Sequence, residues 1–151
     1  MAFLLHEFTK LIASIEDSEL EYAVCGGLAM TIHGFVRATI DIDLLIQPET
    51  LEKAFQIAKD NGYNIHGLDI SFKERAVEIR RVSKVIGEDI LSLDLLLVTP
   101  FVEDVWQARQ QIEFMGRHLT VVSLEGLVKM KTLAGRPQDL ADIHRIENEE
   151  D

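Results

Sequence analysis

The sequence predicts an α+β fold in which helices flank a mixed central β-sheet, within a single domain over residues 1–151. Segments with strand character cluster in the middle of the chain, and segments with helical apolar spacing lie mainly outside them. A chain of 151 residues with 47% hydrophobic side chains suits one domain with a two-layer core. No internal repeat or low-complexity tract indicates another architecture.

Helical and strand patterns alternate through the first 60 residues. The first helix is expected where Phe8, Leu11, Ile12 and Ile15 recur at helical spacing. Glycine, proline and asparagine residues end the later segments. The expected elements are a helix at 3–16, a strand at 21–25, a helix at 28–34, a strand at 39–46 and a helix at 49–60.

The second part of the chain is expected to be richer in strands. Ser123 is suited to cap a helix that runs to Ala134, and Gly116 marks a hairpin turn. The acidic end, residues 145–151, is expected to fray. The expected elements are an antiparallel pair at 63–72 and 74–82, a buried strand at 90–98, a helix at 101–110, a hairpin at 111–122 and helices at 123–134 and 137–147.

Charge and composition restrict the partners of the chain. The formal net charge is −11, which disfavours nonspecific DNA binding but leaves room for a local basic pocket. No apolar window is long enough to span a membrane, so no membrane partner is expected. Cys25, the single cysteine, is expected to be a small buried hydrophobe. We find no signal peptide pattern and expect a cytoplasmic location.

Two aspartates interrupt the apolar stretch TIDIDLLI at 39–46. Because side chains alternate along a strand, Ile40, Ile42, Leu44 and Ile46 are expected to face the core, and the two aspartates to share the other face. Two carboxylates about 6–7 Å apart repel each other unless a positive charge lies between them. A divalent cation such as Mg²⁺ would satisfy both, whereas a solvent-exposed strand face is the simpler alternative.

A third carboxylate, Asp94, lies in the very apolar segment LSLDLLLV. An unpaired charge there would be costly to bury. Placed beside Asp41 and Asp43, Asp94 would complete a site of three carboxylates. A salt bridge or a polar strand end is the alternative interpretation of Asp94.

The glycine pair Gly26-Gly27 follows the first expected strand and precedes a short helix. Glycines at such a turn let backbone amides approach a phosphate closely, although turns also use glycine for its conformational freedom. The pair stands upstream of Asp41 and Asp43 in the same stretch of sequence, GGLAMTIHGFVRATIDIDLLI.

These motifs together resemble the nucleotidyltransferase superfamily of the DNA polymerase β type. The stretch is similar to the branch of abortive-infection toxin-type and small uncharacterised nucleotidyltransferases. The likeness extends to LEGLVKMKTLAGRPQDLADI at 124–143 and covers about residues 20–146. The positions outside the acidic trio that match the branch are Gly26, Gly27, Arg37, Thr39, Lys131, Arg136, Asp139 and Asp142.

The resemblance implies transfer of a nucleoside monophosphate from an NTP to an acceptor, with Mg²⁺ or Mn²⁺ as cofactor. Asp41, Asp43 and Asp94 would then be the metal ligands and catalytic residues, and Asp94 would also activate the acceptor hydroxyl. Nucleotide binding would fall to Gly26, Gly27, Arg37, Thr39, Lys131, Arg136 and Asp142, the last also by orienting Lys131 or Arg136.

The acceptor stays open at this point: a protein, an RNA end or a small molecule. Members of the toxin-type branch usually carry a further helical region that helps to grip the acceptor. The chain is therefore expected to act with a separate helical partner protein or as a homo-oligomer. A noncatalytic module of the same fold, acting as an antitoxin or a regulatory binding partner, is the alternative to an enzyme. Each basic residue also has a structural alternative as a solvated surface side chain.

Overall fold

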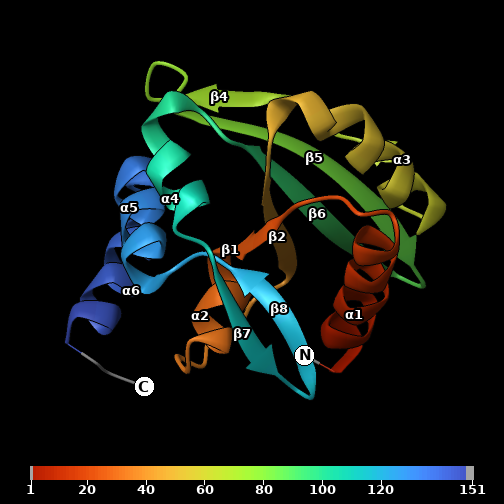
Figure 1. Ribbon diagram of the computed structural model, residues 1–151. Coiled ribbons are helices and arrows are strands. Elements are labelled where there is room, and N and C mark those ends of the chain that lie inside the picture. The colour runs from red at the N-terminus through yellow and green to blue at the C-terminus, as the bar shows by residue number, and fades with distance from the viewer. Residues whose placement is uncertain (1, 149–151) are drawn as a thin grey trace.

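The computed structural model describes residues 2–148, and its elements follow the predicted order (Figure 1). The N-terminal half contains α1 (Ala2–Asp17), β1 (Ala23–Cys25), α2 (Gly26–Ile32), β2 (Asp41–Ile46), the 3₁₀ turn Pro48–Thr50, α3 (Leu51–Asp60), β3 (Ile65–His66) and β4 (Ile70–Phe72). The C-terminal half contains β5 (Val77–Ile86), β6 (Asp89–Leu97), the 3₁₀ turn Pro100–Val102, α4 (Glu103–Gln107), β7 (Gln110–Phe114), β8 (Arg117–Val121), α5 (Leu124–Ala134) and α6 (Pro137–Glu147).

Within residues 2–148, eight strands form one mixed sheet in the order β3-β5-β6-β2-β1-β8-β7, with β4 also paired to β5. The pairs β2–β6 and β1–β8 are parallel, and the other pairs are antiparallel. Figure 1 shows α1 and α3 grouped on one side of the molecule and α4, α5 and α6 on the other. The predicted α+β class with helices around a mixed sheet is confirmed.

The core follows the alternation of side chains along the central strands. Ile42 and Leu44 of β2 and Leu93 and Leu95 of β6 share one face, and all four are buried. Burying such side chains contributes about 1.5–3 kcal/mol each, which fixes the register of the two strands. The register leaves Asp43 and Asp94 together on the opposite face of the sheet.

Several predicted boundaries need correction. The helix expected at 28–34 begins already at Gly26, so the glycine pair forms its first turn. The strand expected at 63–72 is divided into β3 and β4, which both pair with the long β5. The helix expected at 101–110 ends at Gln107, because β7 starts at Gln110 as the sheet edge.

One expectation about exposure is wrong, and part of the expected acidic end lies in a helix. Ile40 was expected in the core but is 79% exposed, because β2 begins only at Asp41 and Ile40 belongs to the loop before it. The expected frayed end at 145–151 overlaps α6, which continues to Glu147 and closes with a hydrogen bond from Asn148 N to His144 O. Residues 149–151 lie outside the described residues.

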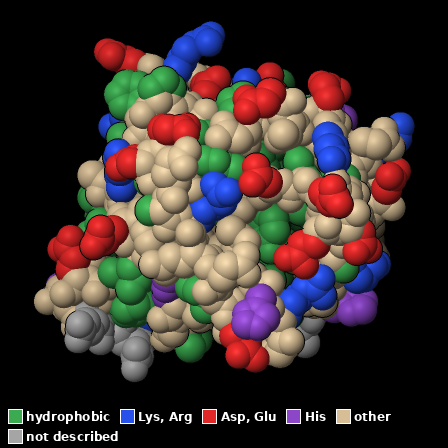
Figure 2. Space-filling view, in the orientation of Figure 1, with side chains coloured by type: hydrophobic (Ala, Val, Ile, Leu, Met, Phe, Trp, Pro, Cys, Tyr) green, Lys and Arg blue, Asp and Glu red, His purple; other side chains and the backbone are tan. Residues whose placement is uncertain are grey.

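The excess of acidic over basic residues in the sequence is visible on the molecular surface (Figure 2). Figure 2 shows Asp and Glu side chains, singly and in small groups, over the face of the molecule in view, with Lys and Arg between them. None of the helices formed by residues 2–148 combines the length and the apolar character needed to cross a lipid bilayer.

Candidate active site

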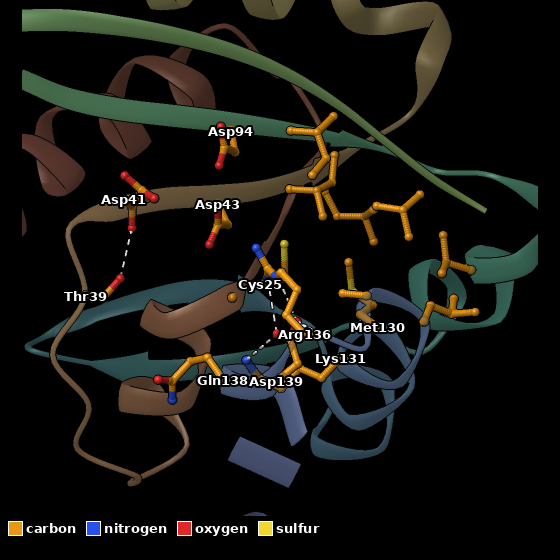
Figure 3. Close-up of a pocket in the computed structure, with 18 of the residues that line it drawn as sticks. Cys25, Thr39, Asp41, Asp43, Asp94, Met130, Lys131, Arg136, Gln138 and Asp139 are labelled. Atoms are coloured by element: carbon orange, nitrogen blue, oxygen red, sulfur yellow. Dashed lines mark hydrogen bonds and ion pairs between the residues drawn. The ribbon is translucent and has the colours of Figure 1, made fainter. Parts of the chain in front are cut away.

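The structure brings the three predicted carboxylates together on one face of the sheet (Figure 3). Asp43 of β2 is the register partner of Asp94 on the parallel strand β6. Asp41 lies two residues before Asp43 on β2 and therefore faces the same way. The trio thus comes from two adjacent strands in the interior of the sheet, each paired on both sides.

Burial and neighbouring negative charges raise the pKa values of the two β2 carboxylates, Asp43 and Asp41. The pKa of Asp43 is raised to about 7, first by burial and then by the negative charges of Asp94 and Asp41. The pKa of Asp41 is raised chiefly by burial, against which the positive charge of Arg81 acts. Negative charge around Asp43 is therefore incompletely balanced, a condition that a bound cation relieves.

Arg81 of β5 is the nearest positive group to the trio. Its Nε and one terminal nitrogen donate to the two carboxylate oxygens of Asp94 at 2.7 and 2.9 Å. The same terminal nitrogen lies 3.5 Å from Asp41 Oδ2. The β5–β6 hairpin sets this arrangement, because its register places Arg81 directly opposite Asp94. The alternative interpretation of Asp94 as a salt-bridge partner therefore describes the structure as it stands.

The glycine pair is required by the side chains that pack against it. Gly26 has a φ of 65°, and a Cβ at this position would overlap the carboxylate of Asp43. A Cβ at Gly27 would lie 2.7 Å from an Arg37 nitrogen and 2.8 Å from Thr39 Oγ1. The two glycines thus bring the start of α2 against the acidic trio and against the loop that carries Arg37 and Thr39.

Lys131 is buried rather than solvated, with 5% exposure. Its Nζ lies 2.8 Å from Asp142 Oδ2 and 3.8 Å from Asp139 Oδ1. Arg37 approaches the other oxygen of Asp142 at 3.3 Å, and Gln138 donates to that oxygen at 3.0 Å. Asp142, itself almost fully buried, therefore holds Lys131 and Arg37 in fixed positions at the pocket.

Arg136 is held by a different acid from the one considered in the sequence. Its Nε and a terminal nitrogen donate to Asp139 at 2.7 and 3.2 Å, and its backbone N–H donates to the same side chain at 3.1 Å. The side chain of Arg136 is 70% exposed at the pocket. Of the two basic residues that Asp142 was expected to orient, it contacts Lys131. Arg136 is instead oriented by Asp139, which also caps α6.

A pocket of about 500 Å³ joins these groups. Its polar part contains the carboxylates of Asp41, Asp43 and Asp94 with Arg81 and Arg136, and Figure 3 shows the labelled side chains from β2, β6 and α5 around it. Gly26, Arg37, Thr39 and Lys131 also line it. Its apolar part is formed by Leu45, Ala76, Val77, Ile79, Leu96, Leu97, Val102, Met130, Leu133 and Ala134.

Two of the predicted nucleotide-binding residues, Gly27 and Asp142, do not line the pocket themselves. Gly27 packs against Arg37 and Thr39, and Asp142 contacts the inner side of Lys131. Both therefore position pocket residues in this structure.

The donor set suits a hard divalent cation, since carboxylate oxygens are the ligands that Mg²⁺ and Mn²⁺ prefer. Within residues 2–148, however, no group of three or more His, Cys, Asp or Glu side chains is already arranged as a metal site. Arg81 is the group that bonds both oxygens of Asp94 and reaches Asp41 in this structure. The residues fit a cation chemically, and a cation requires the oxygens that the guanidinium holds.

A comparison with models of protein families identifies the family of the chain. Residues 3–148 match the model of a family described as nucleotidyltransferase of unknown function (DUF6036). The chain belongs to this nucleotidyltransferase family. The resemblance inferred from the glycine pair and the aspartate motif is thereby confirmed for the superfamily. No curated protein matches the nucleotidyltransferase chain by sequence.

Solved structures share the fold of this nucleotidyltransferase at low identity. A candidate nucleotidyltransferase from Thermotoga maritima superposes with a TM-score of 0.65 at 15% identity, covering 99% of this chain and 95% of that one. The solution structure of the antibiotic-resistance factor ANT(2″)-Ia gives 0.64 at 14% identity, covering 96% and 83%. The crystal structure of ANT(2″)-Ia with adenylyl-2″-tobramycin gives 0.61 at 16% identity, covering 95% and 85%.

Arg81 is the residue of this nucleotidyltransferase site that the motifs did not reveal. It lies in a strand that was predicted only to residue 82, and its role depends on a hairpin partner 13 residues away. The available signal was the alternation Val77, Ile79, Arg81, which places a charge on the face that also carries the acids.

Proposed function

We propose that the chain transfers a nucleoside monophosphate from an NTP to an acceptor hydroxyl, with Mg²⁺ or Mn²⁺ as cofactor. The acceptor oxygen forms a bond to the α-phosphorus, the bond between that phosphorus and the bridging oxygen to the β-phosphate breaks, and pyrophosphate leaves. The supporting observation is that Asp41, Asp43 and Asp94 converge in one pocket with Gly26 and with basic side chains. Family membership supports the same class of reaction.

The three carboxylates are the residues that would hold the cation. When bound, a divalent cation supplies charge neutralisation at the phosphates and lowers the pKa of an acceptor hydroxyl. Asp43 is fixed between its strand partner Asp94 and the start of α2, where Gly26 leaves room for its carboxylate. Asp94 is the residue we propose to take the acceptor proton, since it lies on the second strand of the trio.

The basic side chains supply the charge that a triphosphate requires. Arg136 presents an exposed guanidinium to the pocket, and Asp43 and Asp94 lie close enough to raise its pKa after the larger effect of Asp139. Lys131 and Arg37 are pre-positioned by Asp142, so little conformational entropy is lost when they meet an anion. Thr39 and the backbone at Gly26 would complete the phosphate contacts.

The acceptor is the least defined part of the reaction. A protein, an RNA end and a small molecule are the three classes to test. The net charge of −11 disfavours RNA, because an acidic surface repels its backbone. The structure of ANT(2″)-Ia with adenylyl-2″-tobramycin supports including tobramycin among the small-molecule acceptors to be tested. A helical partner protein or a second copy of the chain is proposed to help hold the acceptor, and the cytoplasm is the proposed location.

Pyrophosphate release tests this proposal. The chain is incubated with Mg²⁺, each NTP and candidate acceptors of the three classes. We expect Asp41→Ala and Asp43→Ala to abolish release while circular dichroism shows an intact fold. Asp104→Ala is the matched control, because Asp104 is a surface acid that pairs with Lys129 outside the pocket. Intact release in either pocket variant would refute the proposed role of the trio.

A noncatalytic module, acting as an antitoxin or regulatory partner, is the second candidate function. The observation that favours it is the ion pair of Arg81 with Asp94, which removes one acid from catalysis in this structure. Such a module would bind Mg·NTP without releasing pyrophosphate under any acceptor. The turnover assay therefore separates the two candidates, whereas nucleotide binding alone does not.

A further inference from the structure

Arg81 pairs with two of the three carboxylates of the acidic site, Asp94 and Asp41. Its guanidinium bonds both oxygens of Asp94 and lies 3.5 Å from Asp41. It reaches the trio from β5, on the far side of β6 from β2. The Asp94 side chain is 10% exposed and the Arg81 side chain 40% exposed, so the pair joins a buried carboxylate to a guanidinium that solvent reaches.

The neighbouring arginine shows that this placement is specific to one face of β5. Arg80 points to the opposite face, where it meets Asp69 at 3.4 Å and Glu78 at 3.5 Å. Arg80 does not line the pocket. The two adjacent arginines therefore face opposite sides of β5, and of the two only Arg81 faces the trio.

A guanidinium and a divalent cation compete for the same oxygens. The planar fork of arginine matches a carboxylate in a bidentate manner, as Arg81 does here with Asp94. A hard cation needs those oxygens free. The triphosphate of an NTP offers the displaced guanidinium another set of anionic oxygens.

We propose that Arg81 is a built-in counter-ion that competes with the divalent cation for Asp94 and Asp41. This inference rests on the proposed function, since it assumes that the trio is the cation site. In the absence of nucleotide, Arg81 keeps the acids paired and the affinity for the free cation low. With Mg·NTP bound, the three carboxylates would hold the cation, and Arg81 would turn to phosphate oxygens. Arg81 is thereby a positioning residue that makes cation uptake depend on nucleotide.

The proposal is tested by measuring how tightly the full chain binds Mn²⁺ in the absence of nucleotide. Electron paramagnetic resonance of the Mn²⁺ that remains free measures this binding. We expect Arg81→Gln to bind Mn²⁺ about fivefold or more tightly than the wild type, since a competing cation has been removed. Arg81→Lys should fall between the two, because a lysine keeps the charge but loses the fork. Arg80→Gln is the control and should match the wild type. Equal or weaker Mn²⁺ binding in Arg81→Gln would overturn the proposal.

A second readout covers the stability of the variant. In EDTA, Arg81→Gln should unfold at lower temperature than the wild type, because Asp94 loses its partner. Mn²⁺ should restore more stability to Arg81→Gln than it adds to the wild type. A loss of stability that Mn²⁺ does not reverse would mean that Arg81 is only a structural ion pair.

The results also separate this inference from the proposed function. Tighter Mn²⁺ binding in Arg81→Gln without pyrophosphate release by the wild type would support the counter-ion and contradict the enzyme. Pyrophosphate release by the wild type with unchanged Mn²⁺ binding in Arg81→Gln would support the enzyme and contradict the counter-ion.

Discussion

Asp43 and Asp94 lie directly opposite each other on the parallel strands β2 and β6. Two acids at matched positions of a buried strand pair repel each other, and the pKa of Asp43 is raised to about 7 in consequence of burial and this repulsion. The arrangement is costly for the fold alone. It is the arrangement expected of a site that holds a cation when it works.

The pH dependence of stability should reveal the strain at Asp43. Between about pH 4, where a free aspartate ionises, and about pH 7, the folded chain keeps a proton on Asp43 that the unfolded chain has released. The free energy of unfolding should therefore fall across this window as pH rises. Urea titrations in EDTA should show this loss in the wild type relative to Asp43→Asn. Parallel curves for the two proteins would contradict the raised pKa.

Gly26 should not tolerate a side chain, for a reason beyond its backbone conformation. Gly26→Ala places a Cβ on the carboxylate of Asp43, and its φ of 65° adds strain of about 1–2 kcal/mol. Gly87→Ala is the matched control, since Gly87 has a φ of 61° and open space around it. The two variants share the strain, so a further loss of stability in Gly26→Ala measures the collision. Equal stability would show that the Asp43 side chain moves away without cost.

Loss of Asp142 should cost the fold more than loss of a surface acid. Asp142→Asn leaves the buried ammonium of Lys131 with an incomplete partner and releases Arg37. Breaking a buried ion pair on one side costs about 3–5 kcal/mol, and Asp139 at 3.8 Å offsets part of this. Urea unfolding of Asp142→Asn against the surface variant Asp104→Asn measures the difference. A loss no larger than that of Asp104→Asn would contradict the anchoring role.

Arg136 should contribute to nucleotide affinity more than to stability, because its side chain is 70% exposed. A hydrogen bond to a charged group contributes about 1.5–3 kcal/mol. Arg136→Gln should therefore weaken Mg·NTP binding roughly tenfold or more, with little change in melting temperature. Calorimetry against Lys129→Gln, a surface variant on α5, provides the comparison. Unchanged affinity would remove Arg136 from the nucleotide site.

The sequence allows the fold and the acidic trio to be predicted because both follow from local patterns. The alternation around Asp41 and Asp43 assigns them to one strand face, and the apolar context of Asp94 marks it as needing a partner. The order of the strands could not be predicted from any local pattern. The trio nevertheless depends on it, because the pairing of β2 with β6 brings Asp94 beside Asp43.

The basic half of the site was harder to predict because long-range contacts decide it. Lys131 is buried only because α6 folds back and brings Asp142 to it, 11 residues further along the chain. The partner of Asp94 depends on the register of the β5–β6 hairpin, which is set by its turn and its core face. A single sequence does not show either register or helix packing, so Arg81 was missed.

The position of a transferred label tests the central claim most directly. The chain is incubated with Mg²⁺, a pool of acceptors and an NTP that carries radiolabel on either its α- or its γ-phosphate. We predict that α-label becomes attached to an acceptor, that γ-label leaves as pyrophosphate, and that Asp43→Asn stops both. Attachment of γ-label, or α-label transfer that persists in Asp43→Asn, would contradict the central claim.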